Sequence, residues 1–547
     1  MRHARNIRLI FVLLRFAIAM PKDCVSYQNS GFFSPLIVDY LNRKQQLEPL
    51  YNRFPDLENF AAQIVEKQQN FAGNRSLLAD TLARQYANLE YFGAVTDNIE
   101  RLRNPNTFTV VTGHQLNLFT GPLYFLYKIA STINLCQTLK KHHPEYDFVP
   151  IYWMATEDHD FEEINFFKVR RQKLVWKRAD GGAVGRLGTD GLDGVLEAFK
   201  QVLGNSTNAD TLKQWFEEAY LNHQTLADAT RWLAHKLFGS RGLVILDADD
   251  RALKAQFAGY VKEELLNQRA WLSTKSSAQL LAPYGLQVNA REVNLFYLDN
   301  GLRERIVEQD GRFQVLNTPL SFSREGILAL VDASPEKFSP NVVMRPLYQE
   351  VILPNLCYIG GGGELAYWLQ LKPYFDRSQV TFPMLLLRDS VLVATRKQTQ
   401  KADSLGLSWN DLFLPAEDLR TVITKRLSAL DLDFSPQKKF LTAQFDELEK
   451  LALSTDKSFG TAVAAQKAKQ LKGLENLEKK LLRAEKRRHE DILNRAVALR
   501  NELFPGGGLQ ERQENFSGFY ADYGPEFIEA ILSGLNPLDQ QFKILVF

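Results

Sequence analysis

One pattern repeats four times along the chain and constrains its fold more than any other. A short apolar run ends abruptly in polar residues at 108–111 before 112–115, 148–154 before 157–160, 243–246 before 247–249, and 384–387 before 388–389. Runs that do not alternate with polar residues predict strands buried on both faces, as in parallel sheets. In open α/β sheets, ligands bind outside the carboxyl ends of the strands. The four polar clusters are therefore predicted to converge on one site.

The segments around these runs predict helices. Residues 36–103 carry apolar side chains at spacings of three and four, and residues 121–139 have the length of a helix that joins two parallel strands. Each apolar run taken singly would also suit a buried helix. Four repeats of the same order favour strands. The chain is expected to be an α/β protein with a Rossmann-like parallel sheet.

Two further regions show other sequence patterns. Residues 291–316 contain Asn-Gly and Asp-Gly turns between short apolar runs, which predicts a β-meander inserted beside the main sheet. From about 391 to 503 the chain is helical, with a coiled-coil spacing that has one stutter. That spacing is carried by Leu474, Leu477, Leu481, Ala484, Ile492, Ala496, Leu499 and Leu503. Pro505 and the glycines after it end the helix, and the run 542–547 predicts a last strand.

Composition narrows the class of protein. The chain has 547 residues, of which 45% are apolar and 24% charged, and its net charge is +2. These values suit a globular protein of several domains and give no overall signal for binding polyanions. Three widely spaced cysteines exclude a disulfide scaffold and indicate a reducing compartment, which we take to be the cytoplasm. No run approaches the length of a transmembrane helix, and no Cys/His spacing predicts a zinc site.

The first twenty residues allow two interpretations. Arg2, Arg5 and Arg8 precede an apolar stretch at 9–14, as in secretory signals. Arg15 interrupts that stretch, and sequence typical of a folded domain follows Met20 directly. We favour an upstream in-frame extension with translation beginning at Met20. The expected organisation is then an extension at 1–20, a core with connecting insertions at 21–390, a helical domain at 391–505, and a segment at 506–547 that packs back on the core.

The first polar cluster is a candidate anion site. It is predicted to lie in the loop between a strand and a helix, where glycine allows close approach of backbone and free amides bind phosphate or carboxylate. Its candidate residues are Thr112, Gly113, His114 and Gln115, joined by Gly121 at the helix start and Lys128 one turn further on. His114 would donate a hydrogen bond to a phosphate oxygen. The alternative is a structural turn between strand and helix with a capping Thr.

The second cluster is the densest in acidic residues. Glu157, Asp158, His159 and Asp160 follow a run that contains Trp153, and they suit a substrate ammonium group, sugar hydroxyls or a divalent cation. Consecutive loop residues do not all point one way, so we do not predict a metal centre. The plain alternative is an acidic helix N-terminus in solvent.

The third group of candidates surrounds a run of four glycines. Gly361, Gly362 and Gly363 lie between an apolar run and a predicted helix, which indicates close backbone approach or a mobile loop. Upstream, Arg345 and Gln349 offer polar groups, and the guanidinium suits a carboxylate or phosphate. Arg388 and Asp389 end the fourth apolar run. The glycine run matches neither a Walker A motif nor a dinucleotide fingerprint. Cys136 and Cys357 lie in apolar segments and are expected in the core.

A basic run lies in the helical region. Between residues 467 and 500 there are eleven Lys or Arg and five Asp or Glu. A solvated coiled-coil face explains such a run without a partner. The alternative is that it binds a nucleic acid, which we do not predict from the sequence.

Four segments together resemble the bacillithiol biosynthesis cysteine-adding enzymes: "TGHQLNLFTGPLYFLYKI", "FVPIYWMATEDHDFEEIN", "MRPLYQEVILPNLCYIGGGGELAYW" and "FPMLLLRDS". The resemblance covers the chain after Met20. It implies a Rossmann-like core similar to class I aminoacyl-tRNA synthetase-like nucleotidyltransferases, and a coiled coil that mediates homodimer formation. Many members have Gln where this chain has His114, and Pro where it has Gly362.

The implied reaction joins L-cysteine to glucosaminyl malate by an amide bond, the last step of bacillithiol synthesis. A free carboxylate is a poor electrophile, so we expect activation by ATP or another nucleotide, most simply to an adenylate or acyl phosphate, with Mg²⁺ as a candidate ion. His114, Glu157, Asp158 and Asp160 are the expected catalytic residues. Arg345 and Arg388 are expected to hold carboxylates, including that of malate.

Two other classes of function remain open at this point. A synthetase-like enzyme that acts on RNA would use the basic helix, although no lysine-rich mobile loop of the synthetase type is present. A non-catalytic scaffold on a Rossmann-like core would show neither turnover nor stabilisation by ligands. The intact polar clusters disfavour the scaffold.

Overall fold

The computed structural model describes residues 23–178, 181–455 and 457–547, so the extension at 1–20 lies outside the described residues. The chain divides into two compact units. The first, which we call the core unit, contains residues up to 28, 32–393 and 509–545. The second, the helical unit, contains 29–31, 394–508 and 546–547. No described helix has the length and hydropathy needed to cross a membrane.

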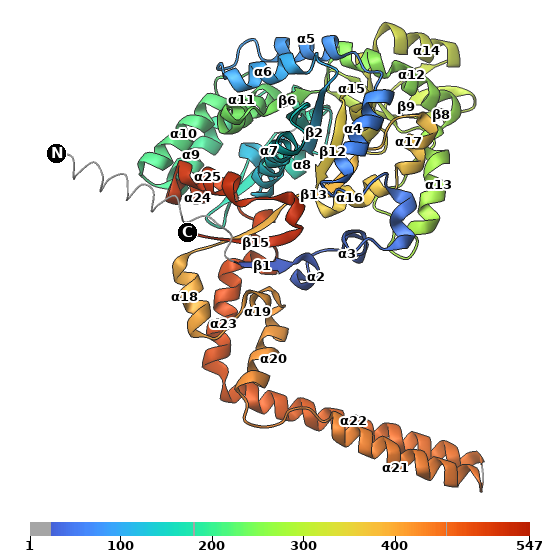
Figure 1. The fold of residues 1–547 in the computed structure, drawn as a ribbon, viewed down its shortest axis with the longest axis vertical. Helices are drawn as coiled ribbons and strands as arrows, with labels where there is room; N and C mark the ends of the chain where they lie inside the picture. The colour runs from blue at the N-terminus through green and yellow to red at the C-terminus, as the bar shows by residue number, and fades with distance from the viewer. Residues whose placement is uncertain (1–22, 179–180, 456) are drawn as a thin grey trace, which may run out of the picture. The chain divides into compact units, whose positions relative to one another are not determined.

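A five-stranded parallel sheet forms the centre of the core unit (Figure 1). Its order is β13-β12-β2-β3-β6, with bounds Met384–Leu387, Asn355–Gly360, Thr107–His114, Asp147–Met154 and Val244–Asp247. All eight residues of β2 are buried, as are all of β12 and β13. The prediction of a Rossmann-like parallel sheet is confirmed, and the four apolar runs supply β2, β3, β6 and β13. The fifth strand, β12, precedes the glycine run.

Helices pack against this sheet and complete its core. The helix α7 (Tyr124–His142) joins β2 to β3 and contacts both. Leu135 and Leu139 of α7 share one apolar cluster with Phe60 and Ile64 of α4 and with residues of β2, β3, β12 and β13. Cys136 and Cys357 lie in that cluster, as expected. Burial raises the pKa of both thiols, so neither is an activated nucleophile.

The other helices of the core unit follow the periodic segments. Their bounds are α2 Tyr27–Ser30, α3 Pro35–Leu41, α4 Asn59–Asn70, α5 Arg75–Gln85, α6 Gly93–Arg101, α8 Phe161–Ile164, α9 Leu192–Leu203, α10 Thr207–Tyr220, α11 Leu226–Phe238, α12 Arg251–Asn267, α13 Arg269–Leu281, α14 Arg324–Ala333, α15 Arg345–Ile352, α16 Gly362–Leu369, α17 Lys372–Ser378, α24 Phe516–Tyr523 and α25 Pro525–Gly534. The helical prediction for 36–103 is confirmed by α3 to α6.

Three smaller sheets accompany the central one. The expected meander forms an antiparallel sheet, β10-β9-β8-β7-β11, from Ser321–Phe322, Arg312–Val315, Leu302–Gln309, Leu295–Asp299 and Phe338–Pro340. A hairpin joins β4 (Phe166–Val169) to β5 (Gln172–Val175). The third sheet joins β1 (Asp23–Ser26), β15 (Gln541–Val546) and β14 (Ser390–Ala394). Residues 391–394 are therefore a strand rather than the helix start that we predicted, because β15 pairs with them.

The helical unit consists of α18 Arg396–Ser404, α19 Trp409–Phe413, α20 Ala416–Leu427, α21 Ser435–Leu453, α22 Lys457–Arg488 and α23 Glu490–Leu503. Figure 1 shows α21 and α22 packed side by side as a hairpin. The predicted coiled-coil spacing is split between two helices at His489. Leu474 and Leu481 lie on α22, half-buried, while Ala496 and Leu499 on α23 are buried. Leu474 and Leu481 of α22 are thus packed within one chain, whereas Leu477 and Ala484 of the same spacing are exposed.

Candidate functional site

The order of the central sheet places the candidate site. From β2 the chain proceeds to β3 and β6 on one side, whereas β12 and β13 lie on the other side. The neighbours β2 and β12 therefore mark the point where the strand order reverses. At such a point the loops after the strands leave in opposite directions and open a crevice for ligands. All four predicted clusters follow strands of this one parallel sheet, as expected.

The carboxyl ends of β2 and β12, a region that we call the crevice after its place in the sheet, approach each other closely at a glycine. Thr112 is buried, and its hydroxyl donates to the carbonyl oxygen of Ile359 on β12 at 2.8 Å, which ties the two strands together. The next residue is Gly113. A Cβ atom there would lie 3.1 Å from the Tyr358 hydroxyl and 3.9 Å from an Arg345 amine nitrogen. Thr112 and Gly113 belong to strand β2, not to the loop we predicted, because they pair with Tyr152 and Trp153 of β3.

A buried ion pair lies behind this glycine. The Lys128 amine contacts the Glu364 carboxylate at 2.5 Å and donates to the Gly113 carbonyl at 2.7 Å. Glu364 also accepts hydrogen bonds from the Tyr358 hydroxyl at 2.7 Å and the Gly361 amide at 2.8 Å. Burial would raise the pKa of Glu364, but Lys128 brings it below its usual value. Burial lowers the pKa of Lys128. The charges of this pair neutralise each other within the site.

Arg345 is the cation of the crevice whose hydrogen-bond partners are all neutral. Its guanidinium donates to the Gln349 side chain at 3.2 Å and to the Tyr367 hydroxyl at 3.1 Å. It lies 5.9 Å from the ring centres of both Trp153 and Tyr358. Among the described residues, no carboxylate forms an ion pair with it within 4.0 Å. The predicted residues Trp153, Arg345 and Gln349 are thus brought together.

The orientation of Gln349 is set by a buried chain of polar groups. Its amide nitrogen donates to Glu350 at 3.0 Å, and Glu350 pairs with Lys67 at 2.8 Å. The amide oxygen of Gln349 therefore faces Arg345. This fixes the guanidinium by neutral contacts without adding a counter-charge beside it.

The glycine run forms the start of α16. Gly361 precedes the helix, and a Cβ atom at Gly363 would meet nothing within 4 Å. At Gly362 a Cβ atom would touch Ile37 at 3.4 Å. The backbone of this turn is consequently open to close approach, as the sequence predicts for a binding loop.

The fourth cluster is placed differently from our expectation. The Arg388 guanidinium donates to the buried Glu511 at 2.7 Å and to the Asp389 carbonyl at 2.8 Å, although its Nε atom is buried without a partner. The Asp389 carboxylate pairs with Lys543 at 2.8 Å and accepts from Ser131 at 2.9 Å. Both side chains are fixed by the carboxyl-terminal segment. We therefore no longer expect Asp389 to contact a ligand, or Arg388 to grip a carboxylate with both amines.

His114 and the start of α7 also differ from the predicted phosphate site. His114 is the last residue of β2 and is buried against the rings of Tyr124 and Phe125. Burial, together with the charges of Lys128 and Arg388, holds the pKa of His114 well below its usual value. The imidazole is therefore neutral near pH 7. It can donate one hydrogen bond but brings no positive charge to a phosphate.

The first turn of α7 is covered by the chain itself. The Leu123 amide donates to the Glu514 carbonyl at 2.9 Å, and the Asn515 side chain donates to the carbonyls of Phe119 and Gly121. Gly121 has φ of +65°, and a Cβ atom there would lie 2.5 Å from the Cβ of Asn117. Gly121 therefore serves the turn, and this helix start is not an open anion site.

The acidic cluster follows β3 and is joined to β2. The Gln115 side chain donates to Asp158 at 2.9 Å and to Glu163 at 3.0 Å, so Gln115 orients acids rather than a nucleotide. Burial would raise the pKa of Asp158, but hydrogen bonds from His159 and Gln115 hold it well below its usual value. Burial and the neighbouring Asp158 raise the pKa of Asp160.

A lysine that the sequence analysis missed connects this cluster to β6. Lys254 of α12 contacts Glu157 at 2.6 Å and Asp249 at 2.9 Å, and Asp249 also pairs with Arg186 at 2.7 Å. Burial raises the pKa of Glu157, and Lys254 opposes that rise. Lys254 lies early in the helix after its strand, as Lys128 does. That repeated position was the sequence signal available for it.

The meander contributes a second missed residue, Arg303 of β8. Its guanidinium lies 2.7 Å from His159 Nδ1 and 4.0 Å from the ring centre of Phe296. Asp158, His159 and Asp160 offer three atoms within 4.8 Å of one another, the usual requirement for a cation site. Arg303 already faces this group, and Mg²⁺ prefers an all-oxygen shell. The residues do not fit a resident metal.

Comparisons with known proteins place these features in context. The family model described as bacillithiol biosynthesis BshC, N-terminal Rossmann-like domain, matches residues 20–389. The model of the C-terminal coiled-coil domain of the same family matches residues 391–547. Among solved structures, a chain from Campylobacter jejuni that is titled an arginyl tRNA synthetase is 10% identical to this chain. The match covers 85% of this chain and 99% of the other, with a TM-score of 0.22. No argument rests on that match.

Relatives of similar length are found among several bacteria. A protein of Flavobacterium johnsoniae is 56% identical over 527 residues, which cover 96% of this chain and 100% of the relative. One of Flavobacterium psychrophilum is 55% identical, covering 96% and 99%. One of Salinibacter ruber is 31% identical, covering 92% and 95%. Each carries the name "Putative cysteine ligase BshC".

Proposed function

Because the chain belongs to the bacillithiol biosynthesis BshC family, we propose that it is a ligase that adds L-cysteine to glucosaminyl malate by forming an amide bond. This reaction would be the last step of bacillithiol synthesis. The observation that carries the proposal is the match of both family models, which together span nearly the whole chain. The site at the sheet edge supports it, because it offers separate groups for anions and for cations.

The reaction needs a carboxylate to become an electrophile. ATP or another nucleotide would supply that activation as a co-substrate. The backbone at Gly362 and Gly363 fits such a group, because a Cβ atom at Gly363 would meet nothing within 4 Å and one at Gly362 would make only ordinary contacts with Ile37 and Phe33. Closely placed backbone amides and fixed cations would then stabilise the negative charge that develops during activation, without reorganisation of the site.

Arg345 is the residue that we assign to a substrate carboxylate, most directly that of malate. A guanidinium binds carboxylates through two parallel hydrogen bonds. Arg345 hydrogen-bonds to neutral partners, and within the part of the chain that the structure describes no carboxylate forms an ion pair with it. Arg388 loses this role because Glu511 occupies it.

The acidic cluster is assigned to cationic and hydroxyl groups of the substrates. Asp158 and Asp160 would hold the cysteine ammonium or sugar hydroxyls, with His159 beside them. Glu157 pairs with Lys254, so we assign it no substrate group. His114 serves as a neutral hydrogen-bond donor beside the crevice and not as a charged phosphate ligand.

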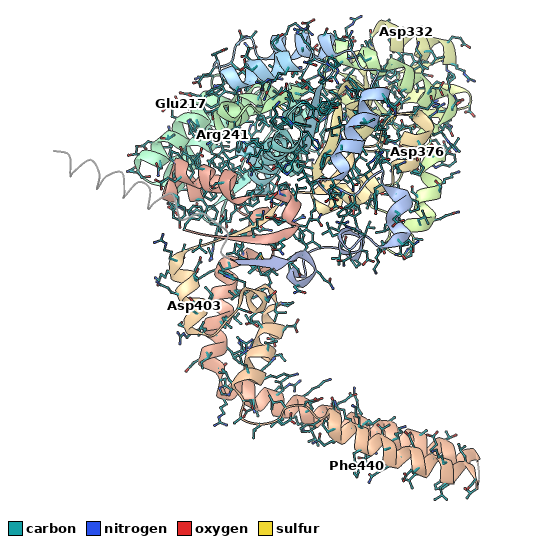
Figure 2. The ribbon with its side chains drawn as sticks, viewed as in Figure 1. Glu217, Arg241, Asp332, Asp376, Asp403 and Phe440 are labelled. Atoms are coloured by element: carbon teal, nitrogen blue, oxygen red, sulfur yellow. The ribbon has the colours of Figure 1, made fainter. Side chains whose placement is uncertain are left out.

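We further propose that two copies associate through the α21–α22 hairpin. Phe440, labelled in Figure 2, is 66% exposed on α21, and Leu477 of α22 is 55% exposed. Large apolar side chains at this exposure favour burial against a second surface. Light scattering of the full chain should give twice the monomer mass. The free state of all three thiols supports the cytoplasm as its compartment.

A turnover assay tests the function. The purified full chain is mixed with glucosaminyl malate, L-cysteine, ATP and Mg²⁺, and mass spectrometry follows bacillithiol, AMP and ADP. Bacillithiol with AMP supports an adenylate route, and bacillithiol with ADP supports an acyl phosphate. If product forms only after host extract is added, the ligase proposal stands, and the activation comes from another donor or from a partner protein. No product even with extract overturns the proposal.

A further inference from the structure

The long helix α22 carries a basic surface that the proposed ligase reaction does not use. With about 100° of rotation per residue, positions 469, 472, 476, 479, 480, 483 and 487 fall on one arc of about 100°. Six of these seven are basic and the seventh is Asn: Lys469, Lys472, Asn476, Lys479, Lys480, Arg483 and Arg487. All six basic side chains are exposed. We call this surface the basic stripe.

The basic stripe is not needed to pack the hairpin. The half-buried residues Leu474 and Leu481 lie on the opposite side of α22, where α21 packs. Coiled-coil helices commonly alternate acids and bases on their outer positions, because opposite charges three or four residues apart stabilise the helix. Within described residues 469–487, the arc contains no acid. Like charges such as Lys479 and Arg483 instead face each other four residues apart.

The same helix does neutralise its other cations. Lys467 pairs with Asp446, Lys486 with Glu417 at 3.2 Å, and Arg488 with Glu485 at 3.8 Å. In the stripe only Lys472 forms an ion pair within the described residues, with Glu475 at 3.0 Å. The helix therefore separates paired cations on its inner flanks from self-repelling cations on its outer face.

We propose that the basic stripe binds the phosphate backbone of a nucleic acid duplex. The stripe is about 27 Å long and carries one charge per about 5 Å, whereas one strand of a duplex carries a phosphate per about 3.4 Å, so each basic side chain has a phosphate within reach over that length. It contains no aromatic or large aliphatic side chain, which a protein interface or an inserted membrane helix would require. Contacts to the phosphate backbone carry no sequence information, so binding is expected to be independent of sequence. This inference does not depend on the ligase proposal.

Fluorescence anisotropy tests it with the full chain and a labelled duplex of mixed sequence, about 20 base pairs long and so longer than the stripe. Six phosphate contacts predict a slope of log K against log salt of about −5, and about 10³-fold weaker binding at 200 mM than at 50 mM KCl. The variant Lys479→Gln/Lys480→Gln/Arg483→Gln should reduce the slope by about 3.

The chain offers a matched control on the same helix. The variant Lys467→Gln/Lys486→Gln/Arg488→Gln removes the same charge from paired, off-stripe positions and should keep the slope of the parent. Circular dichroism checks that both variants retain the helix. The proposal is overturned if the duplex does not bind at 50 mM salt, or if both variants lose affinity equally. It is also overturned if polyglutamate of equal length competes as strongly as unlabelled duplex, since the partner would then be an acidic protein.

Discussion

The two polar groups at the carboxyl edge of the central sheet satisfy their charges in different ways. In the acidic group, Lys254 lies between Glu157 and Asp249, and Arg303 faces the acids that follow β3. In the crevice between β2 and β12, Arg345 has neutral partners, while Lys128 and Glu364 neutralise each other. Residue types alone do not separate the two groups. The charge pairing separates them, and we base on it the proposal that Arg345 binds a substrate carboxylate.

The largest expected effect tests that availability. Arg345→Ala should lower kcat/KM by about 10³-fold, or about 4 kcal/mol of transition-state binding, while the melting temperature changes little. The reason is that no buried acid loses its counter-charge. Arg186→Ala is the contrast in the acidic group: it removes a partner of Asp249 and should lower stability with a much smaller effect on turnover. Equal activity losses in both variants would remove the distinction between the groups.

A stability measurement addresses the acidic group. Lys254→Met leaves the buried carboxylates Glu157 and Asp249 without their common cation, which should cost about 3–5 kcal/mol. The double variant Lys254→Met/Glu157→Gln should recover part of that loss, because one of the uncompensated charges is gone. Thermal unfolding followed by circular dichroism measures both. A single variant as stable as the parent would mean that this lysine does not neutralise the cluster.

The smallest expected effect is a dependence of folding stability on pH, which comes from His114 beside the crevice. The pKa of His114 is lower in the folded protein than in the unfolded chain, so the unfolded chain binds the proton more readily. The stabilisation is present above about pH 6.5 and is lost as pH falls, at up to about 1.4 kcal/mol per pH unit. Relative to His114→Gln, the parent should lose stability between pH 7 and pH 5. A difference that stays constant over this range would contradict the neutral imidazole.

The sequence pattern predicts the sheet well for a local reason. An apolar run that ends in polar residues marks a strand and its carboxyl end, and β2, β3, β6 and β13 follow that pattern. Trp153 was predicted apart from Arg345 and Gln349, and the three do lie together. The run before the glycines supplies β12, whose position beside β2 depends on strand order. Strand order is a property of long-range pairing and leaves no local mark.

The partners of the site were harder to predict because they come from distant segments. Arg303 lies on the meander and Lys254 on α12, far along the chain from the acids that they contact. Glu364 left a local signal, since it stands three residues after Gly361, where an acid caps a helix start. Arg388 and Asp389 were assigned to ligands because Glu511 and Lys543, more than a hundred residues away, could not be placed beside them.

Those two ion pairs have a consequence for how the protein is made. Arg388 and Asp389 are translated before the helical unit, whereas Glu511 and Lys543 come after it. At about 5–20 residues per second, the ribosome supplies Lys543 roughly ten seconds or more after Asp389. Until then a nascent chain carries a cation and an anion that cannot be buried without cost. A chain without Glu511 and Lys543 therefore leaves the Arg388 and Asp389 charges uncompensated, and we expect it to unfold more readily than the full chain.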